Sequence, residues 1–301
     1  MTEVMDNRYA RDWNTYSDRW QEHYGERFNH LGDEWCDDGT EERASEVRWF
    51  THSVQPWLRP ESRVVEIGPG GGKWSVRIAP KVRSLTVFDV AENMLERTAT
   101  RCKAAGLDNV SVVHGDGKAM SAIPSGSVDL VFSYDVFVHI ALEDTVAYVQ
   151  EFARILRDGG MAIVHHAIAD VAPAWDRIES HNDWYRRGNT LGQYYYYSRE
   201  ALEQMYHRAG LRVVATSTSY CTVVLTVVKP QDNLAPWIEQ VLREAAVADT
   251  PAKLEDVSAS LEAIGREMRD RLAGLRKHLE STKPGAARFD AIQKLRRLLR
   301  G

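Results

Sequence analysis

The chain has 301 residues, of which 44% are apolar and 27% are charged, and its formal net charge is −5. This length and apolar content suit one large domain, or one domain with an appendage, around a substantial core, and no apolar run is long enough for a membrane-spanning helix. The negative charge argues against nucleic acid as the main partner, because phosphate backbones require a basic face. The first thirty residues are charged and aromatic and do not resemble a signal peptide, so we expect a cytoplasmic protein.

An aromatic and charged extension occupies residues 1–45. Within it, the aromatic residues Trp13, Tyr16, Trp20 and Tyr24 recur at three- and four-residue steps, which is typical of one face of a helix. Two roles are compatible with such a face. It can pack the extension onto the following domain, and it can form a lid whose rings face a substrate.

Helices and strands alternate through residues 46–230, which we expect to form the main domain. Continuous apolar runs such as VVEI, LTVF and DLVF are typical of strands that are buried on both faces. The pattern predicts a mostly parallel, Rossmann-like α/β sheet with right-handed crossovers and helices on both sides. We expect seven strands at 63–67, 84–89, 110–114, 128–133, 160–168, 211–217 and 222–230, the last two as a hairpin, and helices near 42–57, 73–80, 91–105 and 142–156.

A glycine-rich turn follows the first strand. The segment RVVEIGPGGGKWS at residues 63–75 carries Gly68, Gly70 and Gly72 at every second position, and Glu66 stands two residues before the first glycine. Glycine has no Cβ, so such a turn lets the backbone approach a ligand closely at the carboxyl end of a strand. The turn alone is shared by several nucleotide-binding folds and by ordinary loops.

Three further motifs follow the glycine turn along the chain. Asp89 ends the second strand, where a βαβ unit holds ribose hydroxyls, and the sequences GDG and VDLVFSYD occupy residues 115–117 and 128–135. With the glycine turn, this set resembles the class I S-adenosylmethionine-dependent methyltransferases over roughly residues 45–229. A nucleotide-dependent oxidoreductase is the alternative, but it would favour G-x-G-x-x-G, and Lys73 takes the final position here.

The resemblance implies S-adenosyl-L-methionine as the cofactor and a class I methyltransferase fold with a terminal antiparallel strand. It implies that Glu66 lies close to the methionine end of the cofactor, that Asp89 binds the ribose hydroxyls and that Asp116 binds the adenine amino group. The implied cofactor-binding residues are Glu66, Gly68, Gly70, Gly72, Asp89, Asp116 and Gly117.

Candidates for a general base follow the fourth and fifth strands, whose carboxyl ends should adjoin the methyl group. Asp135 follows the fourth strand, and His139 lies four residues later, so the two can act as a base and its orienting partner. Packing of His139 against the next helix is the alternative. His165 and His166 end the fifth strand and must point to opposite faces. We favour His166 as a catalytic residue, because position 165 shares the face of Ile163 in the core.

A divalent metal such as Mg²⁺ is an alternative that we do not favour. Asp135, His166 and Asp170 could surround one, as carboxylates do in some sugar and catechol methyltransferases. Those families usually have paired acids at the metal, and this sequence lacks such a pair after its fourth and fifth strands.

Residues 169–200 form an insert between the fifth strand and the hairpin. Its tyrosine run, from Tyr194 to Tyr197, would alternate between the two faces of an extended segment. Aromatic rings with polar tips suit a ring-shaped, hydroxylated acceptor, and an arginine suits a phosphate or carboxylate. The substrate-binding residues expected here are Tyr194, Tyr196, Trp184 and Arg186. A surface loop fixed by its aromatic residues is the alternative.

The segment 231–301 has few aromatic residues and many charges. An apolar stripe from Leu261 to Leu279 predicts a helix, and a short basic helix follows the Pro284–Gly285 pair. These helices can pack on the domain or pair two chains as a homodimer. The single basic end is too short for stable membrane insertion.

We expect the acceptor to be a small molecule or a glycan. The aromatic extension, LGDEW at residues 31–35 and the tyrosine-rich insert resemble, more loosely, bacterial saccharide O-methyltransferases, which implies transfer to a sugar hydroxyl. The alternatives are an N-methyltransferase of an amino sugar, an O-methyltransferase of another secondary metabolite, and a cofactor-binding subunit that recruits an active partner.

Overall fold

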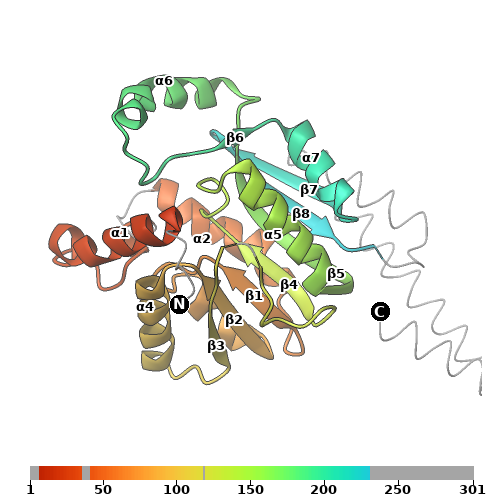
Figure 1. Ribbon diagram of the computed structural model, residues 1–301. Coiled ribbons are helices and arrows are strands. Elements are labelled where there is room, and N and C mark those ends of the chain that lie inside the picture. The colour runs from red at the N-terminus through yellow and green to blue at the C-terminus, as the bar shows by residue number, and fades with distance from the viewer. Residues whose placement is uncertain (1–6, 36–40, 118, 231–301) are drawn as a thin grey trace, which may run out of the picture. The chain divides into compact units, whose positions relative to one another are not determined.

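The computed structural model describes residues 7–35, 41–117 and 119–230 (Figure 1). The helices, the dimer contact and the membrane-binding end considered for residues 231–301 lie outside these ranges. Among the described residues, no helix is both long enough and apolar enough to cross a bilayer.

A mixed sheet of eight strands forms the centre of the fold, in the order β3-β2-β1-β4-β5-β8-β7, with β6 beside β5. Strands β1 to β5 are parallel, whereas β8 runs antiparallel to both β5 and β7. The predicted Rossmann-like sheet with its antiparallel strand is therefore confirmed. The strands are β1 Arg63–Ile67, β2 Ser84–Asp89, β3 Val110–His114, β4 Val128–Ser133, β5 Leu156–Ile168, β6 Tyr196–Tyr197, β7 Arg212–Ser219 and β8 Thr222–Val228.

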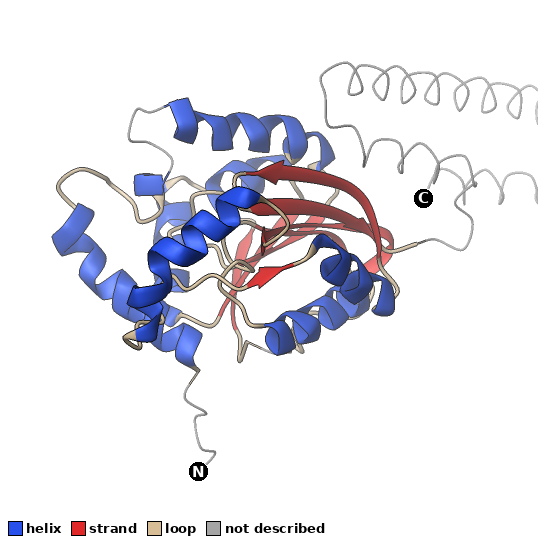
Figure 2. Cartoon of the chain, turned by 90° about the horizontal axis from the view of Figure 1, so that it is seen from above, coloured by secondary structure: helices blue, strands red, loops and turns tan. Residues whose placement is uncertain are grey.

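Helices cover both faces of the sheet (Figures 1 and 2). The helices are α1 Arg8–Tyr24, α2 Glu41–Ser53, α3 Ser75–Ile78, α4 Glu92–Ala104, α5 Leu142–Ile155, α6 Ala172–Arg186 and α7 Arg199–Arg208, with short 3₁₀ turns η1 Asp33–Trp35, η2 Gln55–Trp57 and η3 Ala79–Lys81. Alternate strand residues enter opposite cores: Val65 and Val164 pack with α5 and α7, whereas Val64 and Ile163 pack with α2 and α3.

Two predicted helices are shorter than the sequence pattern suggests. The helix expected at 42–57 ends at Ser53, and the one expected at 73–80 spans only Ser75–Ile78; each is followed by a 3₁₀ turn that contains a proline. Proline lacks the backbone N–H of an α-helical hydrogen bond and restricts the residue before it. Pro56 and Pro80 therefore account for both differences.

Helix α1 packs on α4 through its aromatic face. Trp20 is buried with Leu31 and Met94, and Arg97 donates from Nε to the Ser17 hydroxyl at 2.7 Å. The Asn7 side chain caps the helix by accepting from the backbone N–H groups of Tyr9 and Ala10. The extension is thus folded against the sheet domain, as the periodic aromatic residues predict.

Candidate active site

A cleft opens beyond the carboxyl ends of β1, β2 and β4. Its cavity volume is about 100 Å³, and the cleft is partly open to solvent. Its walls come from α1, from the glycine turn, from the end of β2 and from the loop after β4. Prominent lining residues are Tyr9, Trp13, Gly68, Gly70, Lys73, Asp89, Tyr134, Asp135, His139 and Tyr148.

The glycine turn forms the floor of the cleft. Gly68, Gly70 and Gly72 have φ angles of +67°, +57° and +81°, a region that residues with a side chain seldom adopt. A Cβ on Gly68 would also lie 2.3 Å from Cγ2 of Val136. Gly68 and Gly70 therefore leave bare backbone at the cleft, which fits a cofactor that lies closely against it, whereas Gly72 packs on Thr98 of α4.

Glu66 lies beneath this turn and does not line the cleft. Its side chain is buried and accepts a hydrogen bond of 2.6 Å from the Ser75 hydroxyl. Burial raises the pKa of Glu66 to about 7, and the nearby charge of Asp89 adds to this shift. The structure therefore brings the backbone of the turn, and not this carboxylate, to the cleft wall.

Asp89 lines the cleft at the end of β2. Its Oδ1 accepts from the backbone N–H of Ala91 at 2.9 Å, and burial raises its pKa to about 6. A carboxylate held in this way can accept hydrogen bonds from two neighbouring hydroxyls, as the predicted ribose contact requires.

Asp116 does not line the cleft. Its Oδ1 accepts from the backbone N–H of Ala119 at 2.9 Å, and its own carbonyl accepts from the Asn7 side chain. A Cβ on the adjacent Gly117 would lie 2.8 Å from that same Asn7 nitrogen. The two residues expected at the adenine therefore lie where the loop after β3 meets the start of α1.

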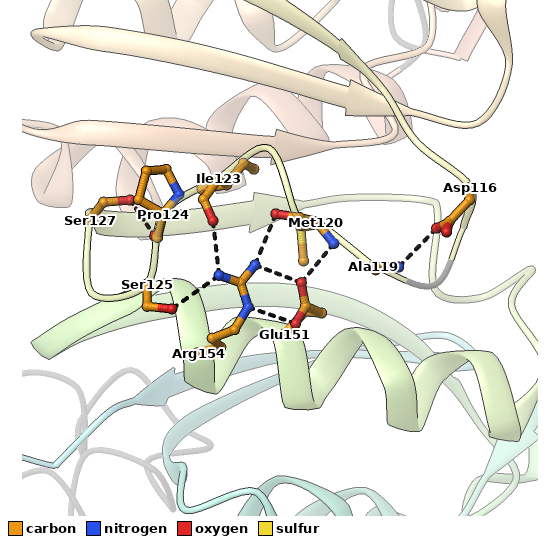
Figure 3. A network of polar contacts seen from close by, with 9 residues as sticks. All are labelled: Asp116, Ala119, Met120, Ile123, Pro124, Ser125, Ser127, Glu151 and Arg154. Carbon is orange, nitrogen blue, oxygen red and sulfur yellow. Dashed lines mark hydrogen bonds and ion pairs between the residues drawn. The ribbon is translucent and has the colours of Figure 1, made fainter.

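The segment after Asp116 is fixed to α5 by a polar network (Figure 3). Arg154 donates to the carbonyls of Met120 and Ile123, both at 2.9 Å, and pairs with Glu151 at 2.7 Å. Glu151 in turn accepts from the backbone N–H of Met120. This network supports the loop that carries Asp116.

Asp135 lies in the cleft with its carboxylate paired to a histidine of β5. Its Oδ1 is 3.1 Å from Nδ1 of His165, and the ring of Tyr134 stacks on His165 at 4.3 Å. Burial acts to raise the pKa of Asp135, but His165, with help from Lys73 and His139, outweighs burial and lowers it to about 2. Asp135 also has a φ of +60°, which is uncommon for a residue with a side chain.

His139 lines the cleft between two aromatic rings. The ring of Trp13 lies 5.1 Å away and that of Tyr194 lies 5.0 Å away, both edge-on. Its Nδ1 is 3.0 Å from the carbonyl oxygen of Gln193, and because a carbonyl can only accept, this nitrogen carries the proton. Burial lowers the pKa of His139, so at neutral pH the ring is neutral and Nε2 holds a lone pair.

His166 does not reach the cleft, and favouring it over His165 is therefore not supported. It is fully buried, and its Nε2 is 2.9 Å from the Tyr206 hydroxyl on α7. Burial lowers its pKa to about 3. The two histidines point to opposite faces of the sheet, as expected. His165 shares the face of Ile163, and this face leads to Asp135. The face of His166 is covered by α5 and α7.

The metal alternative gains no support from the described ranges, which contain no group of three or more His, Cys, Asp or Glu side chains that could hold an ion. Asp135, His166 and Asp170 do not converge. Asp170 instead accepts from the backbone N–H of Arg199 at 2.6 Å, at the start of α7.

The tyrosine run lies on the far side of His139, and its side chains alternate as expected. Tyr194 and Tyr196 share one face with ring centroids 6.0 Å apart, whereas Tyr197 packs in the core and donates to the Ile140 carbonyl at 2.8 Å. Trp184 and Arg186, by contrast, are exposed on α6. Of the four predicted substrate residues, Tyr194 contacts His139 of the cleft, and Tyr196 lies behind it against the Tyr194 ring.

Other residues reach the site without a clear sequence signal. Tyr9 lines the cleft, donates to Asp144 at 2.8 Å and accepts from the Ala141 backbone N–H, more than 130 residues away in the chain. Helix α1 is further joined to the insert, because the Thr190 hydroxyl donates to Asp12 at 2.5 Å. These contacts join segments so distant in sequence that local patterns cannot reveal them.

Lys73 lies at the cleft beside the glycine turn, where its side chain is mostly buried. Its Nζ is 3.2 Å from Glu46 of α2 and 4.6 Å from the centre of the Trp74 ring. The position of Lys73 within the glycine motif could have identified it as a site residue.

Comparisons with known proteins agree with this geometry. Residues 64–160 match a family model described as a methyltransferase domain. The chain is 26% identical over 123 residues to the uncharacterized methyltransferase YcgJ of Bacillus subtilis, covering 41% of this chain and 47% of that protein. It is 25% identical over 183 residues to phosphoethanolamine N-methyltransferase 1 of Caenorhabditis elegans. This match covers 61% of this chain and 36% of that protein. These matches span about half or less of the relatives' own length.

Among solved structures, the chain is similar to magnesium protoporphyrin IX methyltransferase from Synechocystis PCC 6803 with bound SAH. The TM-score is 0.55 at 20% identity, over 73% of this chain and 98% of that one. At this identity the similarity shows a shared fold. The family match therefore identifies residues 64–160 as a methyltransferase domain, and the glycine turn and the shared fold agree with the resemblance to the class I S-adenosylmethionine-dependent methyltransferases.

Proposed function

We propose that the chain transfers a methyl group from S-adenosylmethionine to a hydroxyl of a small polar acceptor, with His139 as the general base. The observation that carries this proposal is the His139 ring in the cleft, which donates from Nδ1 to Gln193 and so keeps a basic Nε2. A hydroxyl needs such a base, whose contribution is typically about 10²–10⁴-fold.

The cofactor site is supported by the bare backbone of the glycine turn and by Asp89, both on the cleft wall. When bound, the cofactor supplies an electrophilic methyl group on a sulfonium. The chain's own part is to hold the acceptor in line with that group, to exclude water with Tyr9 and Trp13, and to remove the acceptor's proton.

Asp135 has a supporting role in this proposal. Its ionised carboxylate raises the pKa of His139 against the larger opposing effect of burial. It thereby stabilises the imidazolium that forms when Nε2 takes the proton. Replacement of Asp135 should therefore weaken the base without removing it.

A sugar or glycan is the first acceptor class to test. It is supported by the aromatic side chains around His139, which combine apolar faces with polar tips. An amine is the second candidate, because an ionised Asp135 beside the Tyr134 ring suits an ammonium group, and one relative is named as an N-methyltransferase.

The test is transfer of labelled methyl groups to free sugars, oligosaccharides, amino sugars and polyphenols, with and without EDTA, by the wild type and H139Q. We expect labelled hydroxyl acceptors and a loss of at least 10²-fold in kcat for H139Q. Labelling of amines only, with H139Q active, would favour N-methylation. Stoichiometric cofactor binding without any product would contradict an enzymatic role.

A further inference from the structure

Arg177 of α6 packs against the ring of Tyr194, which in turn contacts His139 of the cleft. Its Cζ lies 4.1 Å from the centre of the Tyr194 ring, whereas Trp175 and Trp184 on the same helix are exposed. Tyr185, Tyr196 and Cys221 also lie close enough to influence its charge. The guanidinium is therefore held in an aromatic pocket at the edge of the insert.

The guanidinium of Arg177 interacts with the Tyr196 hydroxyl, but its Nε has no acceptor and its charge has no acidic partner in the described ranges. Its Nε is buried and makes no hydrogen bond in the described ranges. The groups that act on its charge are tyrosines and a cysteine, and no carboxylate is among them. Arg101 and Arg154, in contrast, each pair with an acid. A buried cationic donor without an acceptor is costly, so the arrangement favours an anion supplied from outside.

Arg177 and the proposed base His139 are linked by the ring of Tyr194. The Tyr194 ring touches both side chains, 4.1 Å from Cζ of Arg177 and 5.0 Å from the His139 ring. The charge of Arg177 contributes to lowering the pKa of His139, after the larger effect of burial. Arg177 and His139 thus contact the same tyrosine ring and influence each other's charge.

We propose that Arg177 binds a carboxylate or phosphate of the acceptor, so that the acceptor is an anionic molecule whose reacting group lies at His139. This inference rests on the proposed function. A guanidinium can bind either anion through two parallel N–H groups, and the Tyr194 face beneath it fixes the plane of that fork. Arg177 therefore takes the role that the sequence suggested for Arg186.

Asp135 does not oppose such an acceptor. Its carboxylate lies 3.1 Å from Nδ1 of His165, and the positive charge of Lys73 also acts on it. The anionic end of the acceptor would lie beyond Tyr194, and only the reacting group would approach Asp135.

The first experiment measures anion binding without turnover. The protein is saturated with S-adenosylhomocysteine and titrated calorimetrically with inorganic phosphate or with acetate. We expect saturable binding that weakens at least tenfold in R177Q, less in R177K, and not in R208Q, an exposed arginine on α7 that serves as the matched control. Circular dichroism and the thermal midpoint of each variant establish that it is folded.

Three outcomes would overturn the inference. These are no anion binding to the cofactor-loaded wild type, equal binding by R177Q and the wild type, and a loss in R186Q that R177Q does not share. The last would return the role to Arg186. Preference for phosphate or for acetate tells which anion the acceptor carries.

The second experiment uses turnover on matched acceptors, such as a sugar and its phosphate, or an acid and its amide. We expect the wild type to favour the anionic member at least tenfold in kcat/KM, mainly through KM, and R177Q to lose that preference. Methylation of neutral acceptors with R177Q unaffected would sink the inference and leave the proposed function standing. Anion binding that depends on Arg177, without any methyl transfer, would support the inference about Arg177 and contradict the proposed function.

Discussion

The carboxylate of Asp135 lies 3.1 Å from Nδ1 of His165, and this contact sets the charge at the end of β4. The same Nδ1 is 3.2 Å from the backbone N–H of Asp135. One nitrogen cannot both donate to the carboxylate and accept from the amide. The charge-assisted bond to the carboxylate is the stronger, and it is the one that keeps Asp135 ionised.

The first prediction concerns D135N and its dependence on pH. The pKa of Asp135 is lowered from 3.8 to about 2, so ionised Asp135 stabilises the fold above pH 3.8, and this is lost as the pH falls through about 2. We expect D135N to lower the free energy of unfolding at pH 7 by about 1–2 kcal/mol. Urea unfolding at several pH values checks this. An equal loss at pH 7 and near pH 2 would contradict it.

In the second prediction, replacing a buried carboxylate stabilises the fold instead of destabilising it. Burial raises the pKa of Glu66 from 4.5 to about 7, so its ionisation increasingly costs stability as the pH rises from 4.5 to 7. We expect E66Q to stabilise the cofactor-free protein by about 1–3 kcal/mol at pH 8 and to have little effect at pH 4. Thermal unfolding at both pH values gives the answer. Destabilisation at pH 8 would show that ionised Glu66 is held by contacts stronger than its bond to Ser75.

The third prediction is a pH profile. Burial lowers the pKa of His139 below its ordinary value of 6.5, so the base is already unprotonated at neutral pH. We expect kcat for a hydroxyl acceptor to rise with pH only below 6.5 and then to remain level to pH 8. H139Q should lack the acidic limb while its dissociation constant for the cofactor stays within threefold. An acidic limb that persists in H139Q would point to another base.

The fourth prediction addresses how the extension fits the glycine turn. A Cβ on Gly71 would lie 2.1 Å from the Leu31 carbonyl oxygen, so G71A should force the two backbones apart. We expect a loss of about 1–3 kcal/mol in stability and at least tenfold weaker cofactor binding. G106A is the control, since its Cβ meets nothing within 4 Å and only its backbone is strained. Normal cofactor binding by G71A would separate the extension from the cofactor site.

A fifth prediction tests the network of Figure 3. R154Q removes the ion pair with Glu151 and the donors to Met120 and Ile123. We expect a stability loss of about 1–2 kcal/mol and a three- to tenfold weaker affinity for the cofactor, because the Asp116 loop loses its support. Calorimetric titration with S-adenosylhomocysteine measures the affinity. An unchanged affinity would mean that this loop does not contribute to cofactor binding.

The sequence predicts the sheet well and the insert poorly, for physical reasons. Strands buried on both faces leave continuous apolar runs, and these located β1, β2 and β4. Helix α6 was not predicted, because only Ala174 among its residues is buried and no apolar stripe marks it. Contacts with α2, α3, α5 and α7 bury both faces of β5, so its two histidines could not be told apart from the alternation alone.

The site residues also fall into two groups, those that the sequence could predict and those that it could not. The glycine turn, Asp89 and Asp135 belong to motifs at strand ends, and the fold brings them to one cleft. Tyr9 and Arg177 depend on how an extension and an insert pack across the fold, which spacing along the chain does not encode.

The bond between Asp12 and Thr190 links two segments that are 178 residues apart, and Arg8 adds a contact with the Tyr195 ring. Tyr9 and Trp13 of the same helix wall the cleft, and together with Thr190 and Tyr195 of the insert they line a small pocket beside it. A ligand large enough to touch both segments must pass while they are apart. The rate at which these contacts break therefore sets an upper limit on turnover for such a ligand, independent of the speed of the chemical step.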